Sequence, residues 1–134
     1  MCYFTFGFAQ SNIGMVQIAE KVSLDGITMG PTLAALREDG ELDEGRLALL
    51  NTFALALLRW QIPTNDISGR NIVLGQRNGH EMFLAVDGFG DIHAIPSRTY
   101  SKWIRRHFLA QRFTKVADRL SLDFDPKAFA FRLA

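Results

Sequence analysis

The sequence predicts a mostly helical α+β fold, and three patterns support this class. Near the N-terminus, apolar residues alternate with small or polar ones with a period of two, which is typical of strands. Residues 42–60 and 98–120 repeat apolar side chains at helical spacing. Between these two segments, an Asn-Gly pair separates two short apolar runs, which is the strongest short-range signal for a β-hairpin. A chain of 134 residues suits one domain.

The composition excludes several classes of protein. Hydrophobic residues make up 48% of the chain and charged residues 22%, which excludes a disordered or low-complexity chain. The net charge of +1 gives no overall argument for nucleic-acid binding. Cys2 is the single cysteine, so an internal disulfide is impossible. The sequence shows neither a signal-peptide pattern nor an apolar run near the roughly 20 residues that span a bilayer, so we expect a soluble, cytoplasmic protein.

The first unit, residues 1–30, is expected to hold two strands. Apolar side chains alternate along residues 2–9, and residues 15–22 form a second strand-like run. The link between the two runs is short and polar, which favours an antiparallel hairpin. Residues 23–30 are small and turn-forming, so they should lead out of this hairpin.

The middle unit, residues 31–95, is expected to combine helices, polar loops and the Asn-Gly hairpin. Pro31 is tolerated in a first helical turn, and the pattern predicts a short helix from it to Gly40. The helix at 42–60 is the clearest in the chain, with Asp43 in its first turn, where the helix dipole favours anions.

The last unit, residues 96–134, is basic and is expected to form helices. It carries nine Lys and Arg against three Asp and Glu, whereas the rest of the chain carries six against eleven. On the helix at 98–120, an apolar stripe that includes Trp103 and Phe108 should be buried. Three arginines repeat every seven residues and should form one outer ridge: Arg105, Arg112 and Arg119. Such a ridge is either a solvated face or a contact for an acidic partner, nucleic-acid phosphates or an anionic membrane surface.

The candidate chemistry lies at the open end of the predicted Asn-Gly hairpin. Counting outward from the two-residue turn places Asn71 opposite Val86, and Asp87 comes next along the strand. Asp66 precedes Asn71 by five residues and can fold back over this end from the loop. Two carboxylates and an amide oxygen that converge suit a hard cation such as Mg²⁺. Two structural alternatives stay open, with Asp66 as a turn residue and Asp87 as an ordinary strand exit.

These motifs resemble those of protein kinases. Asp66 and Asn71, followed by a hairpin and Asp87-Gly88-Phe89-Gly90, are similar to the kinase catalytic loop and the metal-binding Asp-Phe-Gly motif. More narrowly, the chain is similar to the PhoP regulatory network protein (YrbL) family of bacterial kinase-like proteins in the segments NDISGRNIVL, AVDGFGD and AIPSRTYSKWIRRHFLAQRF. The specific part of the likeness covers residues 60–115, and a looser part reaches back to residues 15–22.

The resemblance implies a fold like the C-lobe of a protein kinase, with the two N-terminal strands as a remnant of the other lobe. Asp66 takes the place of the catalytic base that accepts a substrate hydroxyl proton. Asn71 and Asp87 take the place of the ligands that hold Mg²⁺ on the phosphates of ATP. The segment 20–22 resembles the hinge whose backbone meets the adenine, so Glu20 and Val22 are the candidate cofactor-binding residues.

The chain also departs from the kinase pattern. Thr64 stands where kinases usually have the catalytic-loop histidine, and Gly88-Phe89 replaces Phe-Gly after the metal aspartate. The chain has no G-x-G-x-x-G loop, and Lys21 is the only lysine before Lys102, so we expect the larger lobe without most of the small N-terminal lobe.

Two functions therefore stay open. One is a phosphotransferase-type domain, which is an ATP-dependent enzyme if the missing lobe complements it. The other is a catalytically inactive regulatory module that contacts an acidic partner or a polyanion through its basic C-terminal helix.

Overall fold

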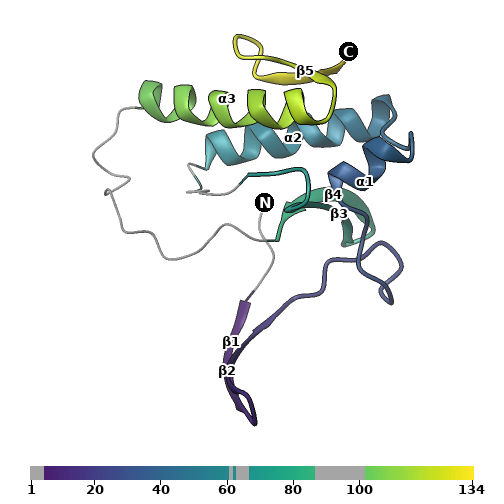
Figure 1. Cartoon of the computed structure of the whole chain (residues 1–134), viewed down its shortest axis with the longest axis vertical. Helices are drawn as coiled ribbons and strands as arrows, with labels where there is room; N and C mark the ends of the chain where they lie inside the picture. The colour runs from purple at the N-terminus through teal and green to yellow at the C-terminus, as the bar shows by residue number, and fades with distance from the viewer. Residues whose placement is uncertain (1–4, 61, 63–66, 87–101) are drawn as a thin grey trace.

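The computed structural model describes residues 5–60, 62, 67–86 and 102–134 (Figure 1). The strands pair as three antiparallel hairpins, and each hairpin forms a two-stranded sheet of its own. The α+β class is therefore confirmed. The described elements, in chain order, are β1 Thr5–Ser11, β2 Gly14–Ala19, α1 Leu33–Glu38, α2 Glu44–Arg59, β3 Ile72–Arg77, β4 His80–Ala85, α3 Lys102–Arg119, β5 Leu122–Asp125 and β6 Ala130–Leu133.

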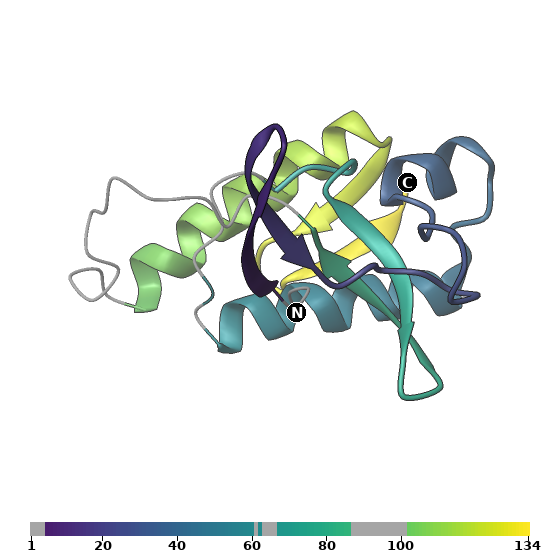
Figure 2. The ribbon, with the colours of Figure 1, turned by 90° about the horizontal axis from the view of Figure 1, so that it is seen from below.

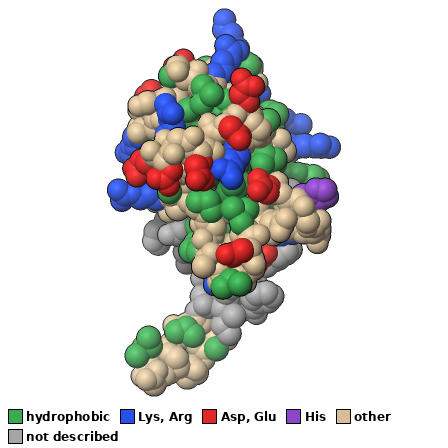
Figure 3. Space-filling model, turned by 90° about the vertical axis from the view of Figure 1, so that its right-hand side faces the viewer, with side chains coloured by type: hydrophobic (Ala, Val, Ile, Leu, Met, Phe, Trp, Pro, Cys, Tyr) green, Lys and Arg blue, Asp and Glu red, His purple; other side chains and the backbone are tan. Residues whose placement is uncertain are grey.

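The β1–β2 hairpin confirms the pair of strands predicted near the N-terminus. In its turn the Ser11 hydroxyl donates to the carbonyl of Gly14 at 2.8 Å and accepts from the N–H of Ile13 at 3.3 Å. Gly14 has a φ of 120°, in the region that favours glycine. Figures 1 and 3 show the hairpin extending away from the rest of the molecule, and it exposes the apolar side chains of Phe8, Ile13 and Met15.

Both predicted helices of the middle unit are present, and each begins at a capping side chain. The hydroxyl of Thr32 accepts from the N–H of Ala35 at 3.1 Å at the start of α1. The carboxylate of Asp43 accepts from the N–H of Arg46 at 2.8 Å at the start of α2. These bonds satisfy amide groups that have no partner within the helix. Pro31 precedes the cap of α1 and so lies just outside the first turn in which it was expected.

The core forms where α2 and α3 meet the hairpins. Figure 1 shows α2 and α3 side by side, with β5–β6 along α3 and β3–β4 beside α2. Seen from below, β3–β4 crosses α2, and its Asn-Gly turn extends beyond the helix (Figure 2). The largest fully buried side chains are Phe83, Phe113, Phe129, Phe131, Leu33, Leu36, Leu50, Leu57, Ile72, Leu74 and Val73.

The second edge of β3 is covered by the segment that leads into α1. The N–H of Leu74 donates to the carbonyl of Pro31 at 2.9 Å, and the N–H of Gln76 donates to the carbonyl of Ser23 at 2.8 Å. The approach is so close that a Cβ atom at Gly30 would lie 1.9 Å from the carbonyl oxygen of Leu74. The fold therefore needs a glycine here, and β3 is held from both edges.

α3 corrects the predicted burial of Trp103 and Phe108, which are 74% and 52% exposed. The buried face is centred on Phe113 and Ala117 instead. Phe108 lies on the opposite side of the helix from Phe113. Trp103 lies in the first turn of α3, two turns before Ala110. Figures 1 and 2 show that the first turns of α3 extend beyond the end of α2. Helical spacing predicted the element but not which face the fold covers.

The β5–β6 hairpin corrects the expectation that residues 96–134 form only helices. α3 ends at Arg119, and Ser121, with a φ of 52°, turns the chain into β5. The turn between the strands is held by Asp125, whose carboxylate accepts from the N–H of Lys127 at 2.8 Å and of Ala128 at 3.1 Å. The hairpin is favoured over a further helix because its aromatic side chains form a cluster with the α3 core: Phe113, Phe124, Phe129 and Phe131.

Candidate functional site

The β3–β4 hairpin has the register that the Asn-Gly turn predicts. Arg77 pairs with His80 beside the turn, and the pairing continues without a shift to Ile72 and Ala85. Beyond the last of these pairs, the N–H of Val86 donates to the carbonyl of Asn71 at 2.9 Å. The predicted placement of Asn71 opposite Val86 is therefore confirmed.

The other two residues of the predicted Mg²⁺ site, Asp66 and Asp87, lie outside the described residues. Each is joined by a peptide bond to a described neighbour, Asp66 to Ile67 and Asp87 to Val86. Within the described ranges there is no group of three or more His, Cys, Asp or Glu side chains that would hold a metal ion. The convergence of the three oxygen-bearing side chains stays a prediction.

Asn71 is positioned by a turn that is anchored to α1. Its N–H donates to the carbonyl of Ser68 at 3.1 Å, and the carbonyl of Gly69 accepts from the N–H of Ala34 at 2.9 Å. A Cβ atom at Gly69 would lie 3.1 Å from the side chain of Leu120, so the turn also packs closely against the end of α3. The half-buried Asn71 thus follows directly after a turn that is hydrogen-bonded to α1 and packed against the end of α3.

Arg37 joins these two helices, and the sequence analysis did not single it out. Its Nε donates to the carbonyl of Leu120 at 2.8 Å, and one of its terminal nitrogens donates to the carbonyl of Ser121 at 3.0 Å. The last carbonyls of a helix have no partner within the helix, so a guanidinium from α1 can satisfy them. The local sequence carries no signal for this contact, because its partners lie more than eighty residues away along the chain.

The candidate hinge lies against the same hairpin. Val22 is buried and packs with Val73 of β3 and Leu84 of β4. Its carbonyl accepts from the N–H of Gly30 at 2.9 Å, so this acceptor already has a partner within the fold. Val73 is two residues from Asn71, about 7 Å along an extended strand. The structure therefore packs the candidate hinge residue Val22 against β3, and the metal-ligand candidate Asn71 directly precedes this strand.

Glu20, the other cofactor-binding candidate, forms an ion pair with the hairpin. Its carboxylate accepts from a terminal nitrogen of Arg77 at 2.6 Å, and both side chains are half-buried. Arg77 is the last residue of β3, next to the Asn-Gly turn. Glu20 thus holds the start of the hinge at the end of β3 that is remote from Asn71.

The loop after the hinge is held by Asp25. Its carboxylate accepts from the N–H groups of Ile27 and Thr28, each at 2.8 Å, and from the Thr28 hydroxyl at 2.8 Å. These hydrogen bonds, that from the Ile27 N–H first, lower the pKa of Asp25 to about 2. The ammonium group of Lys21 donates to the carbonyl of Ile27 in the same loop. The single lysine near the hinge is therefore engaged by the loop backbone.

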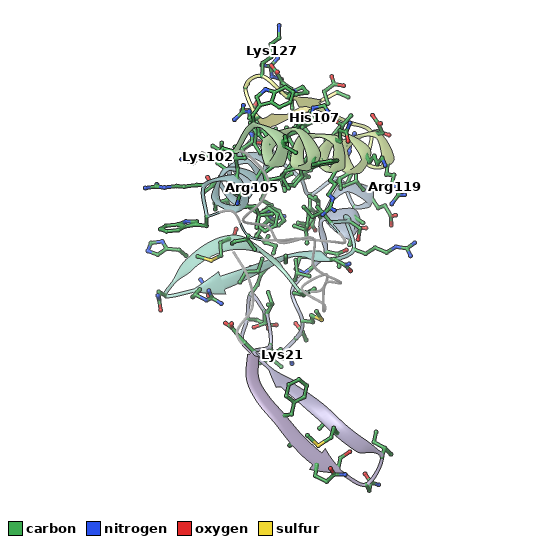
Figure 4. All side chains as sticks on the ribbon, turned by 90° about the vertical axis from the view of Figure 1, so that its left-hand side faces the viewer. Lys21, Lys102, Arg105, His107, Arg119 and Lys127 are labelled. Carbon is green, nitrogen blue, oxygen red and sulfur yellow. The ribbon has the colours of Figure 1, made fainter. Side chains whose placement is uncertain are left out.

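The three arginines of the predicted ridge on α3 differ in exposure. Arg119 is exposed, whereas Arg105 and Arg112 are half-buried. Figure 4 shows Arg105 and Arg119 at different points along the helix. The charge of the ridge is therefore most accessible at its C-terminal end.

These features define an α+β protein in which the partly buried β3–β4 hairpin packs against the candidate hinge residue Val22 and is preceded by the predicted ligand Asn71. The sequence model of the PhoP regulatory network protein YrbL family matches residues 4–121. The chain therefore belongs to the YrbL family, as its motifs predicted. The match ends just before β5, so the β5–β6 hairpin lies beyond the matched residues. No curated protein matched the chain significantly, and no solved structure did. Within the described part of the chain, no helix is long and apolar enough to cross a membrane.

Proposed function

We propose that this member of the YrbL family is a kinase-like, phosphotransferase-type domain that binds ATP with Mg²⁺. The observation that carries the proposal is the hydrogen bond between Val86 and Asn71 at the open end of β3–β4. Because Asp87 follows Val86 along the chain, this hydrogen bond supports the proposal that Asn71 and Asp87 act together at one end of the hairpin. Such a relationship is what two ligands of one metal ion need, and it arises here from segments fifteen residues apart.

The chemistry of the donor set fits the cation. An amide oxygen from Asn71 and a carboxylate from Asp87 are hard oxygen ligands of the kind that Mg²⁺ prefers. Bound there, Mg²⁺ would neutralise charge on the nucleotide phosphates. Asp66 would accept the proton of a substrate hydroxyl, and the backbone of Glu20 and Val22 would meet the adenine beside Val73.

A second candidate function rests on Lys21. Phosphoryl transfer in kinases uses a lysine on the phosphates together with the metal-binding aspartate. Lys21 is the only lysine in the first hundred residues, and its ammonium group donates to the carbonyl of Ile27. This observation favours a catalytically inactive module that binds without turnover. The phosphotransferase function requires binding of Mg²⁺ and nucleotide, whereas the inactive module does not. Binding is therefore the property to measure first.

The test is the position of a bound metal ion, measured by NMR with Mn²⁺ as the paramagnetic probe, with and without ATP. We expect the amide signals of Asn71, Ile72 and Val86 to broaden first. The signals of Asn78 and Gly79, about 23 Å away along the same hairpin, should persist and serve as an internal control. Excess Mg²⁺ should restore the broadened signals.

Matched variants separate this site from general cation binding. Asn71→Ala and Asp87→Asn should each abolish the selective broadening. Asp123→Asn removes an exposed carboxylate from β5, which lies beyond the two helices, and should leave the broadening unchanged (Figure 1). Broadening that is centred away from the open end of β3–β4, or that survives both site variants, would contradict the proposed site.

A further inference from the structure

The first turns of α3 carry a set of aromatic side chains that are ordered and exposed. Trp103 stacks on His107, with ring centroids 5.9 Å apart and planes 10° apart. His107 meets Phe108 edge to face at 6.2 Å. Trp103 is 74% exposed and Phe108 52%. Large apolar side chains exposed together on one helix usually mark a contact surface.

The same helix is strongly basic. It carries six Lys and Arg residues and one acidic residue, Asp118. Arg106 turns inward, where it donates to the carbonyl of Lys127 at 3.1 Å and lies over the ring of Phe129 at 4.9 Å. Lys102, Lys115 and Arg119 are exposed, and no salt bridge to any described residue neutralises them. The exposed side of α3 therefore attracts anions.

Most of the aromatic and basic groups lie on the outward side of the helix. Phe108, Gln111, Lys115 and Arg119 face away from buried Phe113 and Ala117. Trp103 lies two turns before Ala110 on the same side of the helix as that residue, and its ring stacks on His107, which is next to the outward side. The first turns of α3 also extend beyond the end of α2 in two perpendicular views (Figures 1 and 2). Within the described part of the chain, this surface is therefore convex and exposed, as contact with a large, flat partner needs.

We propose that this outward face of α3, formed by His107, Phe108, Lys115 and Arg119 together with the exposed ring of Trp103 at its N-terminal end, docks on an anionic lipid bilayer. Tryptophan and phenylalanine settle at the boundary between headgroups and acyl chains, and lysine and arginine meet the lipid phosphates. The negative surface potential of such a bilayer attracts each basic residue that lies near it. The proposal does not depend on the proposed phosphotransferase function.

A bilayer fits this surface better than a nucleic acid does. Single strands are bound in grooves where successive bases stack on aromatic faces. Here the aromatic groups lie on a convex helix, and Trp103 already has one face covered by His107. Exposed apolar rings flanked by cations are instead the pattern of an interfacial helix.

The test is binding of the full chain to vesicles, measured by co-sedimentation and by tryptophan fluorescence. The chain carries two tryptophans, and Trp60 is also exposed, so the Trp60→Phe variant makes the fluorescence report on Trp103 alone. With equal parts phosphatidylglycerol and phosphatidylcholine, we expect binding with a blue shift of Trp103 emission. With phosphatidylcholine alone, binding should be at least tenfold weaker, and added salt should weaken binding to the anionic vesicles.

Two variants and one matched control identify the face. Trp103→Ala combined with Phe108→Ala, and Lys115→Glu combined with Arg119→Glu, should each weaken binding at least tenfold. The melting temperature should stay within a few degrees, because these side chains are exposed. Lys127→Glu changes an exposed lysine in the β5–β6 turn, whose backbone carbonyl accepts from Arg106 but whose side chain points away from α3 (Figure 4), and should leave binding unchanged.

Three results would overturn the proposal. One is the absence of binding to anionic vesicles, and another is binding that the α3 variants do not weaken. The third is tighter binding of a single-stranded oligonucleotide that depends on the same residues, which would assign the face to nucleic acid instead.

Discussion

The N–H of Val86 donates to the carbonyl of Asn71 at 2.9 Å, so the β3–β4 pairing continues to the residue before Asp87. Fifteen residues separate the two partners, and a tight Asn-Gly turn brings them together. Asn78 and Gly79 both have positive φ, at 53° and 80°, as a turn of this kind needs. A two-residue turn fixes the register of the two strands. The pairing of Asn71 with Val86 at the open end of the hairpin therefore follows from the Asn-Gly turn at its closed end.

Arg37→Ala should destabilise the fold by about 1–3 kcal/mol, because it removes charge-assisted hydrogen bonds to two carbonyls. Those carbonyls belong to Leu120 and Ser121 at the end of α3. Urea denaturation followed by circular dichroism measures the change. Arg59→Ala, at the exposed end of α2, is the matched control and should change stability by less than about 0.5 kcal/mol. Equal losses of stability in the two variants would show that the hydrogen bonds of Arg37 do not stabilise the fold.

Gly30→Ala should destabilise the fold by about 3 kcal/mol or more, since the added Cβ would overlap backbone that cannot move alone. That Cβ would lie 1.9 Å from the carbonyl oxygen of Leu74. Gly45→Ala, in the first turn of α2, meets nothing closer than 3.4 Å and should be neutral or stabilise by roughly 0.5 kcal/mol. Thermal unfolding of the two variants makes the comparison. A Gly30→Ala protein as stable as Gly45→Ala would mean that the segment before α1 does not lie against β3.

The carboxyl of Asp25 should titrate with a midpoint near pH 2, well below the ordinary value of 3.8. A lowered pKa means that the ionised form is favoured in the folded state, so its stabilising effect is complete only above about pH 5, where the unfolded chain is also ionised. The effect is lost progressively as the pH falls from about 5 to about 1, through the folded-state pKa. Carbon-detected NMR of the side-chain carboxyl measures the midpoint directly. Thr28→Val removes the hydroxyl donor and should raise the midpoint; a wild-type midpoint at the ordinary value would contradict the hydrogen-bonded loop.

Phe113→Ala should cost about 3–5 kcal/mol of stability, because the ring is fully buried among other aromatic side chains. Trp103→Ala should change stability by less than about 0.5 kcal/mol, because that ring is mostly exposed. Chemical denaturation of both variants measures the two losses of stability and shows which is larger. A larger loss for Trp103→Ala would restore the sequence-based expectation that Trp103 belongs to the core.

What the sequence predicted and what it missed differ in the range of the interactions involved. The β3–β4 register and the presence of α1 and α2 depend on neighbours within a few residues, so local rules were sufficient to predict them. The helix starts were expected at Pro31 and residue 42, whereas the helices begin after the caps Thr32 and Asp43. The β5–β6 hairpin depends on a distant partner. The side chain of Asn51 in α2 accepts from the N–H of Phe131 at 2.6 Å and donates to its carbonyl at 3.1 Å, which is a tertiary contact that no local pattern reveals.

The candidate site divides in the same way. Asn71 could be placed because it is tied to the Asn-Gly turn by strand pairing. The contacts of Arg37 and Gly69 that support Asn71 could not be predicted, because they join α1 to the end of α3, and these two segments are distant in sequence. The exposed face of α3 was misassigned for a related reason. Helical spacing relates Trp103 to its own helix and carries no information on where the neighbouring helix ends.

The purified chain should bind nucleotide without appreciable turnover, since phosphoryl transfer needs a lysine on the phosphates as well as the metal-binding aspartate. Lys21 is engaged by the carbonyl of Ile27, and no other lysine precedes Lys102. A coupled assay of ATP hydrolysis should therefore stay near background in the wild type and in Lys21→Ala alike. Turnover well above background that Asp87→Asn abolishes would show that other groups replace the lysine. Turnover that Lys21→Ala abolishes would show that Lys21 leaves the loop to reach the phosphates, and the inactive-module alternative would then be wrong.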